Sequence, residues 1–250
     1  MPDTAERFQQ GRIFLAGDSA HVMPPSGGFG GNTGVQDAHN LAWKLALVLE
    51  GIAGPELLST YEQERRPAAA FTVEQAYSRY VTRSAPYLRS ENTQAIENDL
   101  NIEFGYVYRS AAVITEDAGG TRTHENPRES KGRPGTRAPH LYLLRGAEKI
   151  STLDLFGRNF VLLAGPEGRA WSESGRAAAK QLGIEVDMHQ IDANGLTDPS
   201  GGFASAYGMA PSGAVLVRPD GFVAWRAKSA EAASAQRLAN VLASVLCRPV

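Results

Sequence analysis

Five glycines lie within eight residues of this chain, at positions 27–34, and this stretch constrains the fold more than any other. An apolar run at residues 12–16 precedes it and stops at Gly17 and Asp18, which is typical of a buried strand that ends in a loop. Beyond the glycines, apolar residues recur at helical spacing over residues 35–50. The sequence therefore predicts a strand, a glycine-rich loop and an amphipathic helix.

The predicted loop has the chemistry of a ligand-binding turn. Glycine has no Cβ, so successive glycines let the backbone lie against a flat ligand. The loop leads into a helix, whose unpaired N–H groups and macrodipole favour an anion or a ring that becomes anionic. No Gly-Lys-Ser/Thr follows the glycines and they do not form a G-x-G-x-x-G opening, so phosphate binding is not the first interpretation.

A few polar and aromatic residues near the loop have simple expected roles. The carboxylate of Asp18 could accept a hydrogen bond from a ligand hydroxyl, and the alternative is that it caps a helix or forms an Asx turn. His21 and His39 flank the loop without a carboxylate cluster, so we expect structural or hydrogen-bonding roles and no metal site. We expect Trp43 to pack in the core and Lys44 to be a solvated charge.

The rest of the first half is predicted to be helical. A second helix is expected from residue 55, with residues 62–66 as an exposed, ion-paired face, and Pro67 is expected to bend or break it. Helical composition resumes over about residues 68–80 and weakens towards residue 102. Residues 116–140 are rich in Gly, Pro, Thr and Arg, and we interpret them as a linker between domains.

The second half follows a different pattern, of short strands and two helices. We expect strands at residues 159–164, 184–191, 214–218 and 222–226, and helices at residues 170–182 and 231–246. This βαβ…ββα order predicts a small thioredoxin-like domain over residues 141–250. The chain is therefore expected to be an α/β protein of two parts.

The charge balance and the cysteine count exclude several functional classes. The formal net charge is −2, which does not indicate a nucleic-acid or anionic-membrane surface. No apolar run approaches the roughly 18–20 residues that span a bilayer, and the first ten residues do not resemble a signal peptide, so a cytoplasmic location is expected. Cys247 is the single cysteine, which excludes an internal disulfide, a Cys-rich zinc site and a Cys-x-x-Cys redox motif.

Several motifs resemble those of the FAD-dependent aromatic hydroxylases, the class A flavoprotein monooxygenases. Residues 11–45, which read GRIFLAGDSAHVMPPSGGFGGNTGVQDAHNLAWKL, resemble their second flavin-binding motif. Residues 61–67, YEQERRP, resemble the helix that follows this motif. Residues 133–140, RPGTRAPH, and residues 213–221, GAVLVRPDG, are similar to the thioredoxin-like appendage of the phenol and polyketide hydroxylase branch.

This resemblance implies a fold and a set of cofactor contacts. Residues 1–115 would be the C-terminal segment of a para-hydroxybenzoate-hydroxylase-like FAD-binding domain, with a helical tail. Within it, Asp18 would bind the ribityl hydroxyl of FAD. The backbone around three residues would meet the pyrimidine side of the isoalloxazine: Gly30, Gly31 and Asn32. Pro24 and Pro25 would line the substrate side, with Pro25 also counted among the cofactor contacts.

The resemblance also implies the chemistry. In such enzymes NAD(P)H reduces FAD, oxygen forms a flavin C4a-hydroperoxide, and this species hydroxylates an electron-rich ring, here a phenolic or polyketide-type substrate. A reduced flavin carries negative charge near N1 and C2=O, where a helix N-terminus would stabilise it. The partners expected are therefore a small aromatic substrate and O2, and the appendage is expected to act as a stabilising or subunit-contact module, as in a homo-oligomer.

The resemblance covers only the C-terminal portion of those enzymes. They begin with a βαβ unit that carries G-x-G-x-x-G and they contain a sheet that covers the substrate, and neither precedes Gly11. We therefore expect this chain to need the N-terminal portion, in the same or a separate chain, to hold FAD and turn over. No catalytic residue is predicted, because the substrate-binding part lies outside this sequence.

Two alternatives belong to other classes. A segment that keeps a flavin motif could be a noncatalytic partner or remnant of a flavoprotein monooxygenase. Gly17-Asp18-Ser19 also resembles the GDS block of a class of esterases, with Ser19 as nucleophile. Against this, the sequence has no late Asp-x-x-His pair and no G-x-S-x-G elbow.

Overall fold

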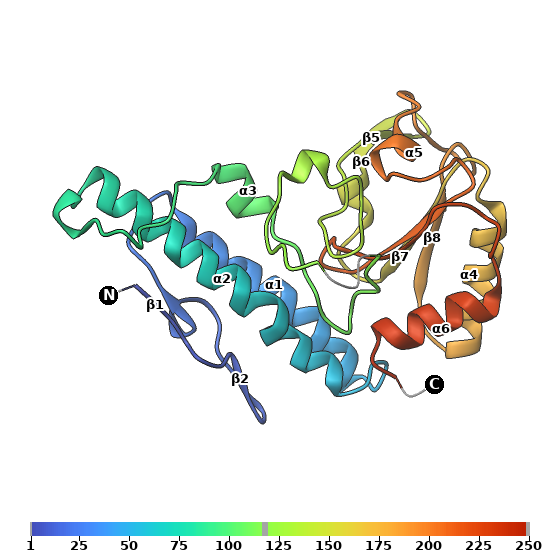
Figure 1. The fold of residues 1–250 in the computed structure, drawn as a ribbon. Helices are drawn as coiled ribbons and strands as arrows, with labels where there is room; N and C mark the ends of the chain where they lie inside the picture. The colour runs from blue at the N-terminus through green and yellow to red at the C-terminus, as the bar shows by residue number, and fades with distance from the viewer. Residues whose placement is uncertain (1, 117–119, 249–250) are drawn as a thin grey trace.

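A computed structural model describes residues 2–116 and 120–248, which form an elongated helical part and a compact α/β part (Figure 1). The helical part is a hairpin of two long helices, α1 (Phe29–Leu49) and α2 (Glu56–Arg83). Four two-residue strands lie beside the hairpin and pair as two ribbons: β1 (Asp3–Thr4) with β4 (His21–Val22), and β2 (Gln9–Gln10) with β3 (Ile13–Phe14). The predicted strand at residues 12–16 is thus present, but only two of its residues are paired.

Helix α1 begins earlier than the sequence pattern predicts. It starts at Phe29, with Gly28 at the N-cap in a left-handed conformation (φ 73°), so the glycines from Gly30 onward are helical and not part of a loop. Glycine costs about 1 kcal/mol relative to alanine inside a helix. Tertiary packing stabilises this first turn, because Phe29 is buried and the Thr33 hydroxyl donates to the Phe29 carbonyl (2.7 Å).

Helix α2 runs through Pro67 without a break, so the break allowed by the sequence prediction does not occur. Proline removes one N–H and frees the carbonyl four residues earlier, which here belongs to Gln63. Both Pro67 and Gln63 lie on the exposed side of the helix, where water can take the freed carbonyl. The buried side, which includes Tyr61, Glu64 and Ala68, keeps its contacts.

The chain between the two parts is packed against both of them. It holds a short helix, α3 (Asp99–Phe104), and 3-10 turns at Pro86–Leu88 and Pro127–Glu129. Residues 135–138 lie along strand β11 (Val223–Ala227), where the Gly135 N–H donates to the Val223 carbonyl and the Val223 N–H donates to the Thr136 carbonyl (2.8 and 2.9 Å). Farther along β11, the Arg226 guanidinium pairs with Glu116 (2.6 and 2.8 Å). The domain limits at residues 115 and 140 stay predictions, while Asp117 to Gly119 of the predicted linker lie outside the described residues.

His124 in this segment gives a pH-dependent stability. It stacks on Phe71, with 3.8 Å between the ring centroids. Burial and the Arg65 charge lower the pKa of His124 to about 4, and the Glu97 charge offsets part of this effect. The unfolded chain therefore binds a proton that the folded chain does not between pH 6.5 and 4, so the residue costs stability as the pH falls. We expect His124→Phe, which keeps the stacking, to reduce the stability lost between about pH 7.5 and 5 by about 2 kcal/mol. Urea unfolding of both proteins at the two pH values measures this, and an identical pH dependence would contradict it.

The second part is built around one mixed sheet, and the four predicted strands and two predicted helices occur in the predicted order, while three short strands and one short helix among the described residues were not predicted. Its elements are β5 (Tyr142–Arg145), β6 (Glu148–Ser151), a 3-10 turn (Thr152–Leu155), β7 (Phe160–Ala164), α4 (Arg169–Leu182), β8 (Val186–Gln190), β9 (Leu196–Thr197), α5 (Phe203–Ala206), β10 (Ala214–Val217), β11 and α6 (Ala235–Val245). The sheet has the order β11-β10-β7-β8, with β7 and β8 parallel across α4 and the other neighbours antiparallel. The predicted mixed α/β fold class is therefore confirmed.

Both faces of this sheet are covered, which explains why β7, β10 and β11 are buried along their whole length. Helices α4 and α6 pack on one face, and the three-stranded sheet β6-β5-β9 and α5 lie on the other. The core under α4 and α6 continues into the helical hairpin, because Trp43 and Leu57 belong to the same cluster as Leu246. The expected packing role of Trp43 is thus confirmed.

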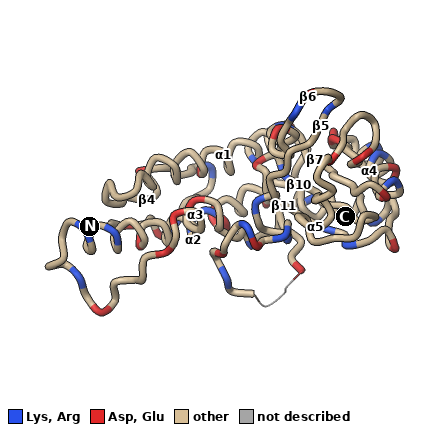
Figure 2. The backbone as a smooth tube through the Cα atoms, turned by 90° about the horizontal axis from the view of Figure 1, so that it is seen from above, with Lys and Arg blue, Asp and Glu red and all other residues tan. Residues whose placement is uncertain are grey.

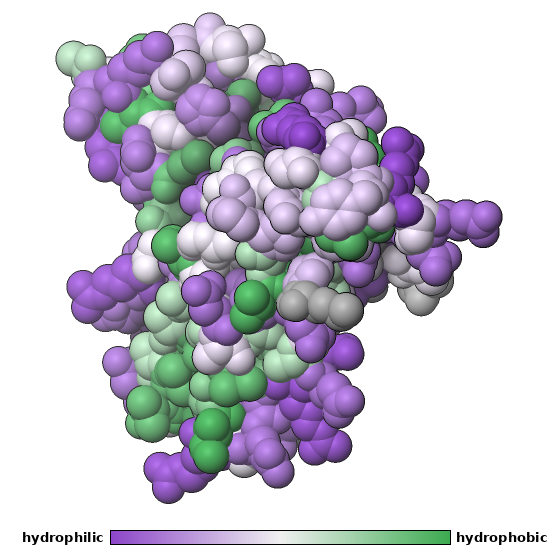
Figure 3. Space-filling view, turned by 90° about the vertical axis from the view of Figure 1, so that its left-hand side faces the viewer, coloured by the Kyte–Doolittle hydropathy of each residue, from purple (hydrophilic) through white to green (hydrophobic). Residues whose placement is uncertain are grey.

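The surface of the described residues shows mixed charge and one apolar face. Lys and Arg alternate with Asp and Glu over both parts of the chain (Figure 2). Hydrophobic side chains gather in a band down one side of the molecule in Figure 3. Among the described residues, no helix combines the length and apolar character required to cross a membrane.

Candidate functional site

The predicted contact residues gather between β3 and the start of α1. After β3, residues Gly17–Ser19 form a 3-10 turn, in which Asp18 is exposed. Within residues 2–116 and 120–248 the Asp18 carboxylate accepts no hydrogen bond, so it neither caps a helix nor forms an Asx turn. It is available to a ligand.

The N-terminus of α1 presents bare backbone in the same region. No side chain caps this helix, which leaves N–H groups of its first turn for a ligand or water. A Cβ added at Gly31 would meet nothing within 4 Å, and one at Gly30 would lie 3.7 Å from Met23. Asn32 is exposed, and its side chain donates to Glu103 of α3 (2.9 Å), so this side chain already has a partner within the chain.

Pro24 and Pro25 precede this helix start, on the segment from β4. Pro24 is partly buried and lines a cavity of about 470 Å³ with Tyr77 and Tyr80 of α2, while Pro25 is exposed. The structure therefore brings all six predicted residues to one end of the helical hairpin, on the turn after β3 and the entry into α1.

Not every glycine of this stretch faces open space. A Cβ at Gly34 would come within 3.1 Å of the Gly17 Cα, so these two glycines let α1 pack closely against the Gly17–Ser19 turn. Gly17 also has a φ of 61°, in the left-handed region that glycine favours. The ligand-contact interpretation of the glycines therefore applies to Gly30 and Gly31, and Gly34 has a packing role.

A buried ionic cluster fixes this turn to α1. Asp37 of α1 is fully buried and accepts from the Gly17 N–H (3.1 Å), His21 Nε2 (2.7 Å) and Arg65 Nε (2.7 Å). Burial alone would raise the pKa of Asp37, but the His21 hydrogen bond and the Arg65 charge outweigh it and lower the pKa. The hydrogen-bonding role expected for His21 is thus confirmed.

A second buried cluster joins the helical hairpin to the α/β part. Glu64 of α2 accepts from Lys44 Nζ (2.8 Å), Arg218 Nη1 (2.6 Å), Arg218 Nη2 (2.9 Å) and Ser110 Oγ (2.6 Å). Arg218 also donates to Asp220 (3.0 Å for Nε to Oδ1), and both stand on the β10–β11 turn. Burial raises the pKa of Glu64, but the Arg218 and Lys44 charges outweigh this effect and lower it.

Two sequence predictions are wrong here. Lys44 is fully buried, and residues Glu64 and Arg65 of the expected exposed face are also buried. Burial and the Arg218 charge, partly offset by Glu64, lower the Lys44 pKa to about 8. One signal was available in the sequence: Asp37, Asn40 and Lys44 fall on the helical side of Leu41, where apolar residues are expected.

The described residues do not assemble a hydrolytic or metal site. The Ser19 hydroxyl donates to the Ala16 carbonyl (2.8 Å), and His21 is fully buried with Asp37, out of reach of an ester in solvent. This geometry disfavours the esterase alternative. Across residues 2–116 and 120–248, no three His, Cys, Asp or Glu side chains gather as metal ligands would, and His39 is exposed.

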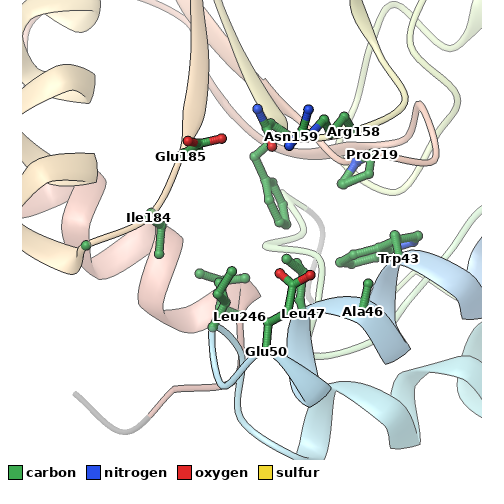
Figure 4. Close-up of a pocket in the computed structure, with 13 residues that line it drawn as sticks. Trp43, Ala46, Leu47, Glu50, Arg158, Asn159, Ile184, Glu185, Pro219 and Leu246 are labelled. Carbon is green, nitrogen blue, oxygen red and sulfur yellow. The ribbon is translucent and has the colours of Figure 1, made fainter.

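A cavity of about 400 Å³ lies elsewhere, at the junction of the two parts (Figure 4). Trp43 and Leu47 of α1, Leu246, and Arg158 and Glu185 from the ends of the sheet line it. Because α1 rises about 1.5 Å per residue, this cavity is roughly 20 Å from the helix N-terminus. It is therefore separate from the predicted cofactor contacts.

The donor set at the helix N-terminus fits a flavin. An isoalloxazine needs a flat surface without side chains, which the open space at Gly31 provides. Its N1–C2=O edge accepts hydrogen bonds and becomes negative on reduction, which suits uncapped helix N–H groups. A ribityl chain has hydroxyl donors, which suit the unpartnered Asp18 carboxylate.

Comparison with known families finds two matches on this chain. Residues 2–76 match the family described as FAD binding domain, and residues 131–249 match the family described as aromatic-ring hydroxylase, C-terminal. The first match contains all six predicted contact residues. The second contains the β10–β11 turn.

Individual relatives agree with these families. The chain is 52% identical over 248 residues to a 4-methyl-5-nitrocatechol 5-monooxygenase from Burkholderia sp, which covers 98% of this chain and 45% of that protein. It is 45% identical over 249 residues to a tetracenomycin A2 monooxygenase-dioxygenase from Streptomyces glaucescens, covering 98% of this chain and 43% of that protein.

Solved structures give the same result. A ternary complex of aklavinone-11 hydroxylase with FAD and aklavinone superposes with a TM-score of 0.92 at 45% identity, over 99% of this chain and 46% of the other. The chain thus spans about half the length of the relatives that it matches. On this evidence the chain belongs to the FAD-dependent aromatic-ring hydroxylases and corresponds to their C-terminal portion.

Proposed function

We propose that this chain supplies part of an FAD-dependent monooxygenase that uses NAD(P)H to hydroxylate an aromatic, phenolic or polyketide-type substrate. Its contribution is the Gly17–Ser19 turn, called the flavin-facing turn below, and the C-terminal domain. One observation carries the proposal. The unpartnered Asp18 carboxylate stands on the turn that packs against Gly34 in the first turns of α1, and the N-terminus of this helix is uncapped and glycine-lined. The relatives support it, because they are monooxygenases of nitrocatechol and tetracenomycin substrates and a hydroxylase held with FAD and aklavinone.

Each contact residue has a proposed role. Asp18 accepts a hydrogen bond from a ribityl hydroxyl and orients the cofactor. The N–H groups around Gly30, Gly31 and Asn32 meet the pyrimidine side of the ring and stabilise negative charge there. Pro24 and Pro25 stand on the substrate side, where they exclude water. When bound, FAD takes electrons from the nicotinamide and activates O2, and no general acid or base is assigned to this chain.

We also propose that the N-terminal portion of such an enzyme packs on the outer face of α1. This face carries exposed small or apolar residues at helical spacing: Val35, Ala38, Ala42, Ala46 and Leu49. Val35 and Leu49 are 70% and 80% exposed, and an amphipathic helix in a finished domain buries such a face. The relatives are about twice as long as this chain, so their additional N-terminal portion is available to cover that face.

Other partners follow from the same proposal. O2 and a small aromatic substrate are consumed at the flavin, and the α/β domain is available for contact in a homo-oligomer. Cys247 is a free, half-buried cysteine, and burial raises the pKa of its thiol. A free thiol fits a reducing compartment, so we place the reaction in the cytoplasm.

Flavin binding by the chain and by the two portions together tests the proposal. We expect the purified chain mixed with FAD to stay nearly colourless after gel filtration. We call this chain combined with the N-terminal portion of a relative, or of its own longer chain, the two-portion protein. It should retain stoichiometric FAD and consume O2 in the presence of NAD(P)H and a phenol. Two portions that associate without binding flavin would overturn the proposal and favour the noncatalytic-partner alternative.

Gly31→Ala separates cofactor binding from stability. The added Cβ meets nothing in this chain, and alanine favours helix over glycine, so we expect the free energy of unfolding to rise by about 1 kcal/mol. The same methyl group occupies the space proposed for the isoalloxazine, so FAD binding by the two-portion protein should weaken by about tenfold or more.

Gly34→Ala is the matched control for this substitution. Its Cβ would lie 3.1 Å from the Gly17 Cα, so the turn must move by a few tenths of an ångström, and the free energy of unfolding should rise by less than in Gly31→Ala. Thermal unfolding of the chain and FAD titration of the two-portion protein give both quantities. Gly31→Ala with unchanged FAD affinity would contradict the proposed ring position.

A further inference from the structure

The α/β domain contacts the flavin-facing turn indirectly, through buried side chains that form one connected series. This inference rests on the proposed function, because it concerns how the proposed cofactor contacts are held. The series begins at the β10–β11 turn and ends at the Gly17 N–H, and every side chain that links the two is buried: Arg218, Tyr108, Arg65 and Asp37. The two ends are about 200 residues apart in the sequence.

At the first step, Arg218 is fixed in position. Its guanidinium is held by both oxygens of Glu64 and by Asp220, and it has no exposed surface. The guanidinium carbon lies 5.3 Å from the centre of the Tyr108 ring. Phe222, on the same turn, stacks on that ring at 4.2 Å. The β10–β11 turn therefore determines where the Tyr108 ring lies.

At the second step, Tyr108 contacts the cluster under the flavin-facing turn. Its hydroxyl accepts a hydrogen bond from Arg65 Nη1 (3.0 Å). Burial raises the pKa of the Tyr108 phenol well above its usual range, so the hydroxyl stays neutral. A neutral acceptor satisfies the guanidinium without competing with Asp37 for its charge.

At the third step, Arg65 holds the turn and the start of α1 together. Its Nε donates to Asp37 (2.7 Å), and its Nη2 donates to the Thr33 carbonyl in the first turns of α1 (3.3 Å). Asp37 in turn accepts from the Gly17 N–H (3.1 Å), next to Asp18. The position of Asp18 relative to the helix N-terminus thus depends on Arg65.

We propose that Tyr108 is a positioning residue through which the C-terminal domain holds Asp18 and the N-terminus of α1 at the spacing that the flavin requires. Side chains that contact a cofactor are precise only when buried neighbours lock them. Here those neighbours include a domain that does not itself reach the cofactor contacts. The appendage is then a support for the flavin site as well as a packing module.

Tyr108→Phe tests this with a matched control. The substitution removes one buried hydroxyl and keeps the ring. Tyr207→Phe does the same inside the α/β domain, where the fully buried Tyr207 donates to the Pro139 carbonyl (3.0 Å). In the 250-residue chain, we expect the Gly17 amide to exchange with solvent about tenfold faster in Tyr108→Phe than in wild type, measured by NMR, and at the wild-type rate in Tyr207→Phe.

The two-portion protein gives a second readout that lost stability alone would not move. We expect a more negative reduction potential for FAD bound to Tyr108→Phe, because the anionic reduced ring is less well met by the helix N-terminus, and an unchanged potential in Tyr207→Phe. Equal Gly17 exchange and equal potentials in the two variants would overturn the inference. A wild-type protein that binds no FAD would overturn the proposed function instead, and the exchange comparison would still decide whether Tyr108 positions the turn.

Discussion

Glu64→Gln is expected to lower the free energy of unfolding by about 3–5 kcal/mol, because it removes the counter-charge of buried Lys44 and one of the two carboxylates that hold buried Arg218. Glu64 is the shared acceptor for Lys44 and Arg218, and none of the three side chains has exposed surface. Glutamine has a similar shape but no charge, so the cavity term is small and the loss is electrostatic. Urea unfolding followed by circular dichroism measures it.

Glu173→Gln is the control for this substitution. Glu173 pairs with Arg169 on an exposed turn of α4 (2.7 Å), and surface pairs contribute little. This variant should unfold at the wild-type urea concentration. If Glu64→Gln did so too, the buried cluster would be irrelevant to stability.

The pH dependence of Glu64→Gln has a definite sign. In wild type the folded-state pKa of Glu64 is lowered, so its contribution is fully present above about pH 4.5 and decreases as the pH falls below it. The variant should lack this part of the acid loss. In the variant Lys44 has lost its counter-charge and can become neutral as the pH rises towards 8 and beyond, so the deficit against wild type should shrink at alkaline pH.

Asp18→Ala should weaken FAD binding by the two-portion protein roughly 10- to 100-fold, which is the effect of losing a hydrogen bond to a charged acceptor. The melting temperature of the chain should not change, because Asp18 is exposed and accepts no hydrogen bond from the described residues. Asp18→Asn keeps an acceptor oxygen but loses the charge, so its FAD affinity should lie between those of wild type and Asp18→Ala. Quenching of FAD fluorescence gives the dissociation constants.

Glu50→Ala is the control for Asp18→Ala. Glu50 is also exposed, and it follows the opposite end of α1 at the cavity of Figure 4. This variant should bind FAD like wild type. Equal affinities in Asp18→Ala and Glu50→Ala would remove Asp18 from the proposed contacts.

Local patterns predicted most of the secondary structure. Strands β7, β10 and β11 are largely apolar runs, and Pro219 and Gly221 mark the turn between the last two, so their positions and order could be read from the sequence. The short strands β5, β6 and β9 lack such a run and were not predicted. The start of α1 could not, because Gly30 and Gly31 disfavour a helix locally, and the burial of Phe29 and the Thr33 hydrogen bond stabilise that turn. The continuation of α2 through Pro67 could not be predicted either, because it depends on Pro67 and Gln63 lying on the side of the helix that faces water.

The predicted contact residues came from a sequence motif. The buried ionic clusters that hold them in place could be identified only from the three-dimensional structure. Glu64 and Arg218 are 154 residues apart, and neither has a local signal that announces the other. Charged side chains are exposed by default, so a sequence pattern assigns Lys44 and Arg65 to the surface until their partners are known. Asp37 is similar, because its three partners come from the turn, β4 and α2.

The core that Trp43 and Leu57 share with Leu246, and the ion pair of Glu64 with Arg218, also limit how this enzyme family can be recombined. A chimera that exchanged only the last hundred or so residues between two relatives would join mismatched halves of one interior. Grafts that carry α1 and α2 together with the terminal domain should tolerate exchange far better. Substrate range in such enzymes is therefore best engineered by crossovers placed upstream of the glycine-lined helix.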